Sequence, residues 1–299
     1  NVTFLREQLR AAQARFNVGE ITRTDVAQSR ARLSLSVSNL AVAKSNQRTS
    51  EANFVRFVGH QPRKLTHIKI LRRLPKTLQA AIAVAERTNP NVLAAAHLEE
   101  ASVHNTEAVK GNLLPTVSLQ ASYDLRHDPG TTFRGHSQSA RIFGSVQVPL
   151  YQAGRVYSQV REAKQISSQR RLETLDVGRQ VRETVVSAWH ALVASRQTIK
   201  SFTDQVNANQ FALEGVRQEA LVGSRTTLDV LDAEQELVDS QVSLAGARRD
   251  AVVAAYRLLG AIGKLTAEDL RLRIAVYDPQ EHYTGTRNRL FGTNTDTVD

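Results

Sequence analysis

The stretch that decides the fold is residues 228–260, LDVLDAEQELVDSQVSLAGARRDAVVAAYRLLG. Apolar pairs recur in it every seven positions over five heptads: Val230/Leu231, Leu237/Val238, Leu244/Ala245, Ala251/Val252 and Leu258/Leu259. An apolar repeat of seven that lasts several heptads is typical of helices that pack on other helices. The stretch therefore predicts a long coiled-coil helix.

The prolines allow this helix to be part of a much longer helical span. All seven lie at positions 62, 75, 90, 115, 129, 149 and 279, so residues 1–61 and 150–278 contain none. Because proline breaks helix interiors, the second span has room for helices of about 70 and 40 residues. A helix of about 70 residues is about 105 Å long, which excludes a fold around one globular core.

The two proline-free spans are copies of one unit. Adding 204 to the residue number aligns the motif Val-Gly-x-x-Thr-x-x-Asp-Val at 18–26 with its second copy at 222–230. It also aligns Leu33 with Leu237 and Gly59 with Gly263. The first copy begins almost at its turn and the chain contains no Met. We therefore expect that most of the upstream half of the first repeat, with the natural N-terminus, precedes Asn1.

The repeated motif predicts the turn of a helical hairpin. Its glycine suits the left-handed position after a helix, and its Thr with an Asp three residues later resembles a capping box. Capping alone explains Thr22, Asp25, Thr226 and Asp229. It does not explain Asp232 or Arg225.

A different pattern lies between the repeats. Residues 116–125 and 142–150 alternate apolar and polar side chains, and the polar loop 126–138 joins them. This pattern fits a membrane-spanning β-hairpin with one face toward lipid, but the pattern alone favours a hairpin that lies on a soluble core. Since an isolated hairpin is unstable, we expect its partner strands in the part before Asn1 and in other copies of the chain.

Taken together, the two tip motifs, the junction VPLYQAGR at 148–155 and the heptad run that ends at Gly263 resemble the TolC-like outer-membrane efflux and type I secretion channels over residues 1–277. The resemblance implies a mainly α fold, in which long antiparallel coiled-coil helices form a trimeric α-barrel and the hairpin contributes to a shared transmembrane β-barrel. It divides the chain into the end of the first periplasmic helical hairpin (1–62), connecting equatorial helices (63–115), the transmembrane β-hairpin (116–150), the second periplasmic helical hairpin (151–264) and a C-terminal equatorial segment with a polar tail (265–299).

The resemblance also implies roles for residues at the hairpin tips. The periplasmic gate corresponds to Arg225, which would bond to Asp25 and Thr24, and two acidic rings that select cations correspond to Asp229 and Asp232. Where the family has a gate Tyr this chain has Ala220. The tips that would dock an adaptor comprise Val18, Gly19, Thr22, Val222, Gly223 and Thr226.

The function that the resemblance implies is a passive exit duct of a tripartite efflux pump or type I secretion system. It would conduct drugs or secreted polypeptides across the periplasm and the outer membrane of a Gram-negative bacterium. Its partners would be two further copies of itself, a periplasmic adaptor protein, an inner-membrane transporter of the RND or ABC class and outer-membrane lipid. No nucleic acid is expected.

Composition leaves one alternative open. The net charge of +10, from 39 basic and 29 acidic residues, also suits a soluble coiled-coil scaffold that binds an anionic partner. The chain has no Cys, and its eight His form no HExxH motif, so we expect no catalytic residue, metal site or cofactor.

Overall fold

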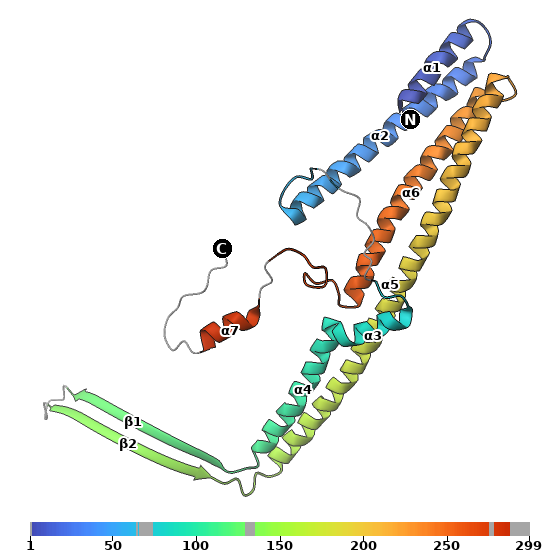
Figure 1. Cartoon of the computed structure of the whole chain (residues 1–299). Coiled ribbons are helices and arrows are strands. Elements are labelled where there is room, and N and C mark those ends of the chain that lie inside the picture. Colours follow the sequence, from blue (N-terminus) through green and yellow to red (C-terminus); the bar gives the residue numbers. More distant parts are fainter. Residues whose placement is uncertain (1, 64, 66–73, 129–134, 275–277, 288–299) are drawn as a thin grey trace. The chain divides into compact units, whose positions relative to one another are not determined.

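The computed structural model describes residues 2–63, 65, 74–128, 135–274 and 278–287 (Figure 1). The chain divides into two units. One consists of Asn1–Leu78 and Val186–Gly260, and the other of Gln79–Val185 and Ala261–Asp299. Helix α5 supplies residues to both.

The first unit contains two helical hairpins. Helices α1 (Val2–Asn17) and α2 (Arg23–Val58) form one, and α5 (Arg155–Leu221) and α6 (Thr227–Ala261) form the other. The lengths of α5 and α6, 67 and 35 residues, confirm the long helices predicted from the absence of proline. None of the helices in the described ranges is long and apolar enough to span a membrane.

The heptad seam of α6 is confirmed, with one shift. Five of its buried positions follow one another three and four residues apart, at Leu244, Ala247, Ala251, Ala254 and Leu258, and Ala255 and Leu259 beside them are buried too. This is the spacing of the a and d positions of a coiled coil. The prediction that Ala245 belongs to the seam is wrong, because the residue three positions after Leu244 is buried and the adjacent one is exposed.

Burial along α2 differs from that along α6. Its buried residues are Ser29 and Ser36, whereas Leu40 is 43% exposed. Its antiparallel neighbour α1 has 16 residues and α2 has 36, so α1 covers only the part of α2 near the turn. In the single chain the apolar residues Val26, Leu33, Phe54 and Val55 of α2 are half-buried, and none of them is fully buried.

In the second unit, α3 (Leu78–Thr88) turns at Asn89 into α4 (Pro90–Gly111). Asn89 caps α4 through its side-chain oxygen, and Pro90 occupies a first-turn position where a missing N–H costs nothing. The same corner satisfies carbonyls at the end of α6: Asn89 Nδ2 donates to the Ala261 carbonyl at 2.8 Å, and Thr88 Oγ1 to that of Ile262 at 2.7 Å. The end of α6 is thus fixed on the α3–α4 corner.

Of the predicted segments 63–115 and 265–299, residues 64, 66–73, 275–277 and 288–299 lie outside the described residues. The described part of the C-terminal segment includes a short helix, α7 (Pro279–Arg287).

Strands β1 (Thr116–Asp128) and β2 (Gly135–Gln147) form an antiparallel hairpin. The register pairs Val117 with Val146 and Ala121 with Ile142, so the alternating apolar residues of both strands share one face, and Phe143, opposite Gln120, is an exception on the other face. On the other face the hydroxyl oxygens of Ser118 and Ser145 are 2.7 Å apart. The alternation predicted from the sequence is confirmed, and the apolar face is exposed in the single chain, with Ile142 81% accessible.

The limits of the second strand differ from those predicted. It begins at Gly135 and not at residue 142, and it ends at Gln147, before Pro149. Pairing with β1 extends the strand through residues 135–141, which are mostly polar and show no alternation. Residues 129–134 of the predicted loop lie outside the described residues.

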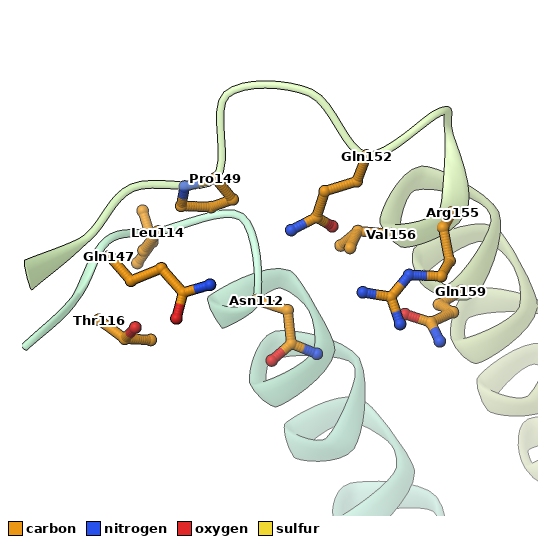
Figure 2. A pocket seen from close by; sticks show the side chains of 9 residues that line it. All are labelled: Asn112, Leu114, Thr116, Gln147, Pro149, Gln152, Arg155, Val156 and Gln159. Atoms are coloured by element: carbon orange, nitrogen blue, oxygen red, sulfur yellow. The ribbon is translucent and has the colours of Figure 1, made fainter.

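A polar cavity of about 330 Å³ lies where the hairpin joins α4 and α5 (Figure 2). Its lining includes the carboxamides of Asn112, Gln147, Gln152 and Gln159 and the guanidinium of Arg155. The buried Gln152 Oε1 has no hydrogen-bond partner among the described residues.

Candidate functional site

The candidate site consists of the two hairpin turns of the first unit, tip 1 between α1 and α2 and tip 2 between α5 and α6. Both end the first helix in the same way. At tip 1 the Gly19 N–H donates to the Phe16 carbonyl at 3.0 Å and the Glu20 N–H to that of Arg15 at 2.9 Å, with Gly19 at φ +80°. This is a Schellman motif, in which a left-handed glycine follows the helix.

Tip 2 repeats this geometry 204 residues later. Gly223 has φ +81°, and its N–H donates to the Ala220 carbonyl at 3.2 Å. The Ser224 N–H donates to the Glu219 carbonyl at 3.0 Å. The prediction that both glycines are left-handed is confirmed.

The predicted caps are also present. Thr22 and Asp25 form a full capping box, in which the Thr22 N–H donates to Asp25 Oδ2 at 2.9 Å and the Asp25 N–H to Thr22 Oγ1 at 3.3 Å. Thr226 and Asp229 make the same pair of bonds at 2.8 and 3.2 Å. The cap is therefore a confirmed structural role of both aspartates.

Each cap also lowers the pKa of its aspartate. The backbone N–H and then the hydroxyl of Thr22 hold the pKa of Asp25 below its ordinary value, and Thr226 lowers the pKa of Asp229 in the same way. Each cap thus favours the ionised form of its aspartate.

Arg225 lies in the turn of tip 2 and pairs with its own hairpin. Its Nε donates to Glu219 Oε2 at 2.8 Å, and this bond raises the pKa of Arg225. In the single chain the bonds of Asp25 go to Thr22, and Thr24 is an exposed residue of the first turn of α2. A bond from Arg225 to Asp25 and Thr24 of a neighbouring hairpin stays a prediction.

Tip 1 has a matching salt bridge of opposite polarity. Arg15 Nε donates to Glu20 Oε2 at 2.9 Å, and position 15 of the first repeat is equivalent to Glu219 of the second. The cation thus stands at the helix end in tip 1 and in the turn in tip 2. Arg15 Nη1 also reaches Thr227 Oγ1 at 3.5 Å, which joins the two tips.

Asp232 lies one turn beyond the cap of α6, and its partner is on the other hairpin. Arg32 Nη2 of α2 donates to Asp232 Oδ1 at 2.5 Å. A second arginine, Arg217 of α5, bonds Glu234 of α6 at 2.8 Å and lies 5.4 Å from the ring centroid of Phe4 in α1.

The sequence did not single out Arg32, Arg217 or Glu219. One available signal for Arg32 was its position seven residues after Asp25, which places both on one face of α2. For Arg217 and Glu219 we find no such signal.

The predicted docking residues are accessible. Val18 and Val222, which precede the two tip glycines, are 72% and 80% exposed. A side chain added at Gly19 or Gly223 would meet nothing within 4 Å. Within the described ranges no group of three His, Cys, Asp or Glu could hold a metal ion.

Comparison with known proteins decides the class of protein. The family model "Outer membrane efflux protein" matches residues 81–264, which include the β-hairpin, α5 and α6. The chain belongs to the outer membrane efflux protein family. This is a family of transport proteins and not of enzymes, and it favours the channel over the soluble scaffold.

The family's named members give the same result. The chain is 41% identical to the outer membrane efflux protein BepC of Brucella suis over 295 residues, 99% of this chain and 65% of BepC. It is 27% identical to the outer membrane protein TolC of Escherichia coli over 279 residues, 88% of this chain and 56% of TolC. The chain therefore spans less than two thirds of either relative. The outer membrane of a Gram-negative bacterium is its location.

A solved structure shares the efflux-protein fold. A membrane protein from Pseudomonas aeruginosa superimposes with a TM-score of 0.75 at 18% identity, covering 88% of this chain and 62% of the other. The predicted fold class, long antiparallel helices with a β-hairpin, is confirmed.

Proposed function

We propose that the chain is part of a homotrimeric exit duct that passively conducts drugs or secreted polypeptides from an inner-membrane transporter to the exterior. The observation that carries the proposal is the register of β1 and β2, which gathers all the apolar residues of the described hairpin except Phe143 on one exposed face. A two-stranded sheet is not stable alone, so such a hairpin needs the strands of further copies. A closed barrel supplies them and turns the apolar face toward lipid.

The five segments predicted from the sequence fit this role. Residues 116–150 would enter the membrane, and the helical hairpins of 1–62 and 151–264 would form a periplasmic tunnel. The segments 63–115 and 265–299 would surround its middle. A periplasmic adaptor would bind the tips, and a transporter of the RND or ABC class would supply the cargo.

The membrane hairpin can be tested by placing Arg on either face of β1. Tyr123 is on the apolar face opposite Ala140, and Gln120 is on the polar face opposite Phe143. We expect Tyr123→Arg to lower barrel stability by about 2 to 4 kcal/mol, because its charge would lie in hydrocarbon. The matched variant Gln120→Arg would change mainly the lumen. The measurement is the free energy of unfolding from lipid vesicles, and equal losses would contradict a lipid-facing hairpin.

The gate can be tested by single-channel recording in planar bilayers. We propose that Arg225 binds Asp25 and Thr24 of the neighbouring hairpin and holds the tips closed, and that Asp229 and Asp232 form acidic rings. Arg225→Ser should then raise the conductance. Replacing both Asp229 and Asp232 with Ala should remove block by multivalent cations, because acidic rings attract cations.

A matched control separates this gate from local effects. Glu219→Gln removes the salt bridge inside tip 2 and leaves Arg225 in place. We expect it to keep the wild-type conductance. If Arg225→Ser also keeps the wild-type conductance and cation block persists in the double variant, these residues serve only as caps and turn contacts.

A further inference from the structure

Two kinds of seam join the helices of the first unit. Within the second hairpin, α6 buries apolar residues such as Leu244 and Leu258. The buried residues of α2 are Ser29 and Ser36, which lie one turn before and one turn after Arg32 on the same helix face. Because burying a serine removes little apolar surface from water, these two fully buried positions gain little from the hydrophobic effect.

Charged and polar contacts join the two hairpins. They are the bond from Arg32 to Asp232 at 2.5 Å, the bond from Arg15 to Thr227 at 3.5 Å and the guanidinium of Arg217 over the ring of Phe4 at 5.4 Å. Only the first of these three is a salt bridge between hairpins. Its side chains are partly exposed, at 34% for Arg32 and 49% for Asp232, so water can replace the bond when the helices separate.

The salt bridge between Arg32 and Asp232 also changes the charge of the tip region. Asp229 and Asp232 are three residues apart on α6, but their partners differ. The Asp229 carboxylate binds the neutral backbone and hydroxyl of Thr226, and the Asp232 carboxylate binds a cation. While Arg32 is in place, the charge of Asp232 is compensated from the other hairpin.

We propose that Arg32 determines cation binding at the tips: it compensates Asp232 while α2 and α6 are in contact, and separation of the two hairpins exposes the Asp232 carboxylate. This inference rests on the proposed function, in which such a separation opens the entrance. It makes Arg32 a selectivity residue that acts through Asp232. It also predicts that an open entrance attracts cations more strongly than a closed one.

The test compares two variants that break the same bond and leave opposite charges. Arg32→Ala leaves Asp232 uncompensated, and Asp232→Asn removes the carboxylate. Both should raise the single-channel conductance, because both release the contact of α2 with α6. We expect terbium(III) to block Arg32→Ala at a concentration at least about threefold lower than wild type, and Asp232→Asn only at a higher one.

Two further variants serve as controls. Arg30→Ala removes an exposed arginine two positions away on α2 and should change neither the conductance nor the block. Combining Arg32→Asp with Asp232→Arg restores the pair in reverse and should return the conductance toward the wild-type value. Block of wild type and Arg32→Ala at the same terbium concentration would overturn the inference.

A binding measurement separates this inference from the proposed function. Terbium luminescence titration of the whole purified protein in detergent needs no conduction. Tighter binding by Arg32→Ala and weaker binding by Asp232→Asn would support the charge compensation even if no variant conducts, a result that would refute only the duct. Equal terbium affinities of wild type, Arg32→Ala and Asp232→Asn would overturn the inference in a conducting protein as well.

Discussion

Replacing both tip glycines, Gly19→Trp with Gly223→Trp, is expected to abolish binding of the periplasmic adaptor while the trimer still assembles. The tips are the exposed ends of the two hairpins, and a glycine there lets another backbone approach closely. An indole at each tip would occupy that space. Neither position has any atom within 4 Å of an added Cβ, so the new side chains would not collide with the chain itself.

The chain offers a matched control for this experiment. Gly59 has φ +85°, close to +80° and +81° at the tips, and its Cβ would also meet nothing within 4 Å. Gly59→Trp therefore carries the same backbone penalty, about 1 to 2 kcal/mol, at the opposite end of α2. Crosslinking in cells to an adaptor protein, with trimer assembly followed on gels, is the measurement. If the tip variant crosslinks as well as Gly59→Trp, the tips are not the docking surface.

We expect the second large effect at Gly263, the equivalent of Gly59 in the second repeat. Its φ is +74°, and an added Cβ would lie 2.3 Å from the Thr88 carbonyl oxygen and 2.8 Å from Asn89 Cα. These are backbone atoms of the corner that binds the end of α6. Gly263→Ala would force this corner away and break its bonds to Ala261 and Ile262.

The expected cost of Gly263→Ala is about 2 to 5 kcal/mol, the sum of left-handed strain and overpacking. Gly59→Ala, with open space around it, should cost only the strain, about 1 to 2 kcal/mol. Urea unfolding of the detergent-solubilised protein, followed by circular dichroism, gives both values. Equal costs would show that the α3–α4 corner does not lie against Gly263.

Local motifs made the tips predictable from the sequence. The left-handed glycine and the Thr–Asp cap involve residues no more than five positions apart, so the motif at 18–26 or 222–230 and the last turn of the helix before it contain all that this geometry needs. The apolar face of the β-hairpin was predictable for a similar reason, since side chains alternate along any strand. The start of β2 could not be predicted, because residues 135–141 join the strand only through their pairing with β1.

The contacts between the two helical hairpins could not be predicted from the sequence. Arg32 and Asp232 are 200 positions apart, and neither repeat alone indicates that they meet. Burial along α2 could not be predicted from the repeat either. A leucine is buried only where another helix covers it, and α1 is less than half as long as α2.

The reversed salt bridges of the tips have a consequence for symmetry. The internal repeat would give a trimer six similar hairpin tips, which suggests a ring of six equal positions. Arg15–Glu20 and Glu219–Arg225 make neighbouring tips different, because the residue at the helix end is a cation in tip 1 and an anion in tip 2. The ring is then threefold and not sixfold. An adaptor that covers all six tips has to bind two different kinds of tip in alternation. Its subunits then either adopt two conformations, one for each kind of tip, or number only three, each bound to one tip of each kind.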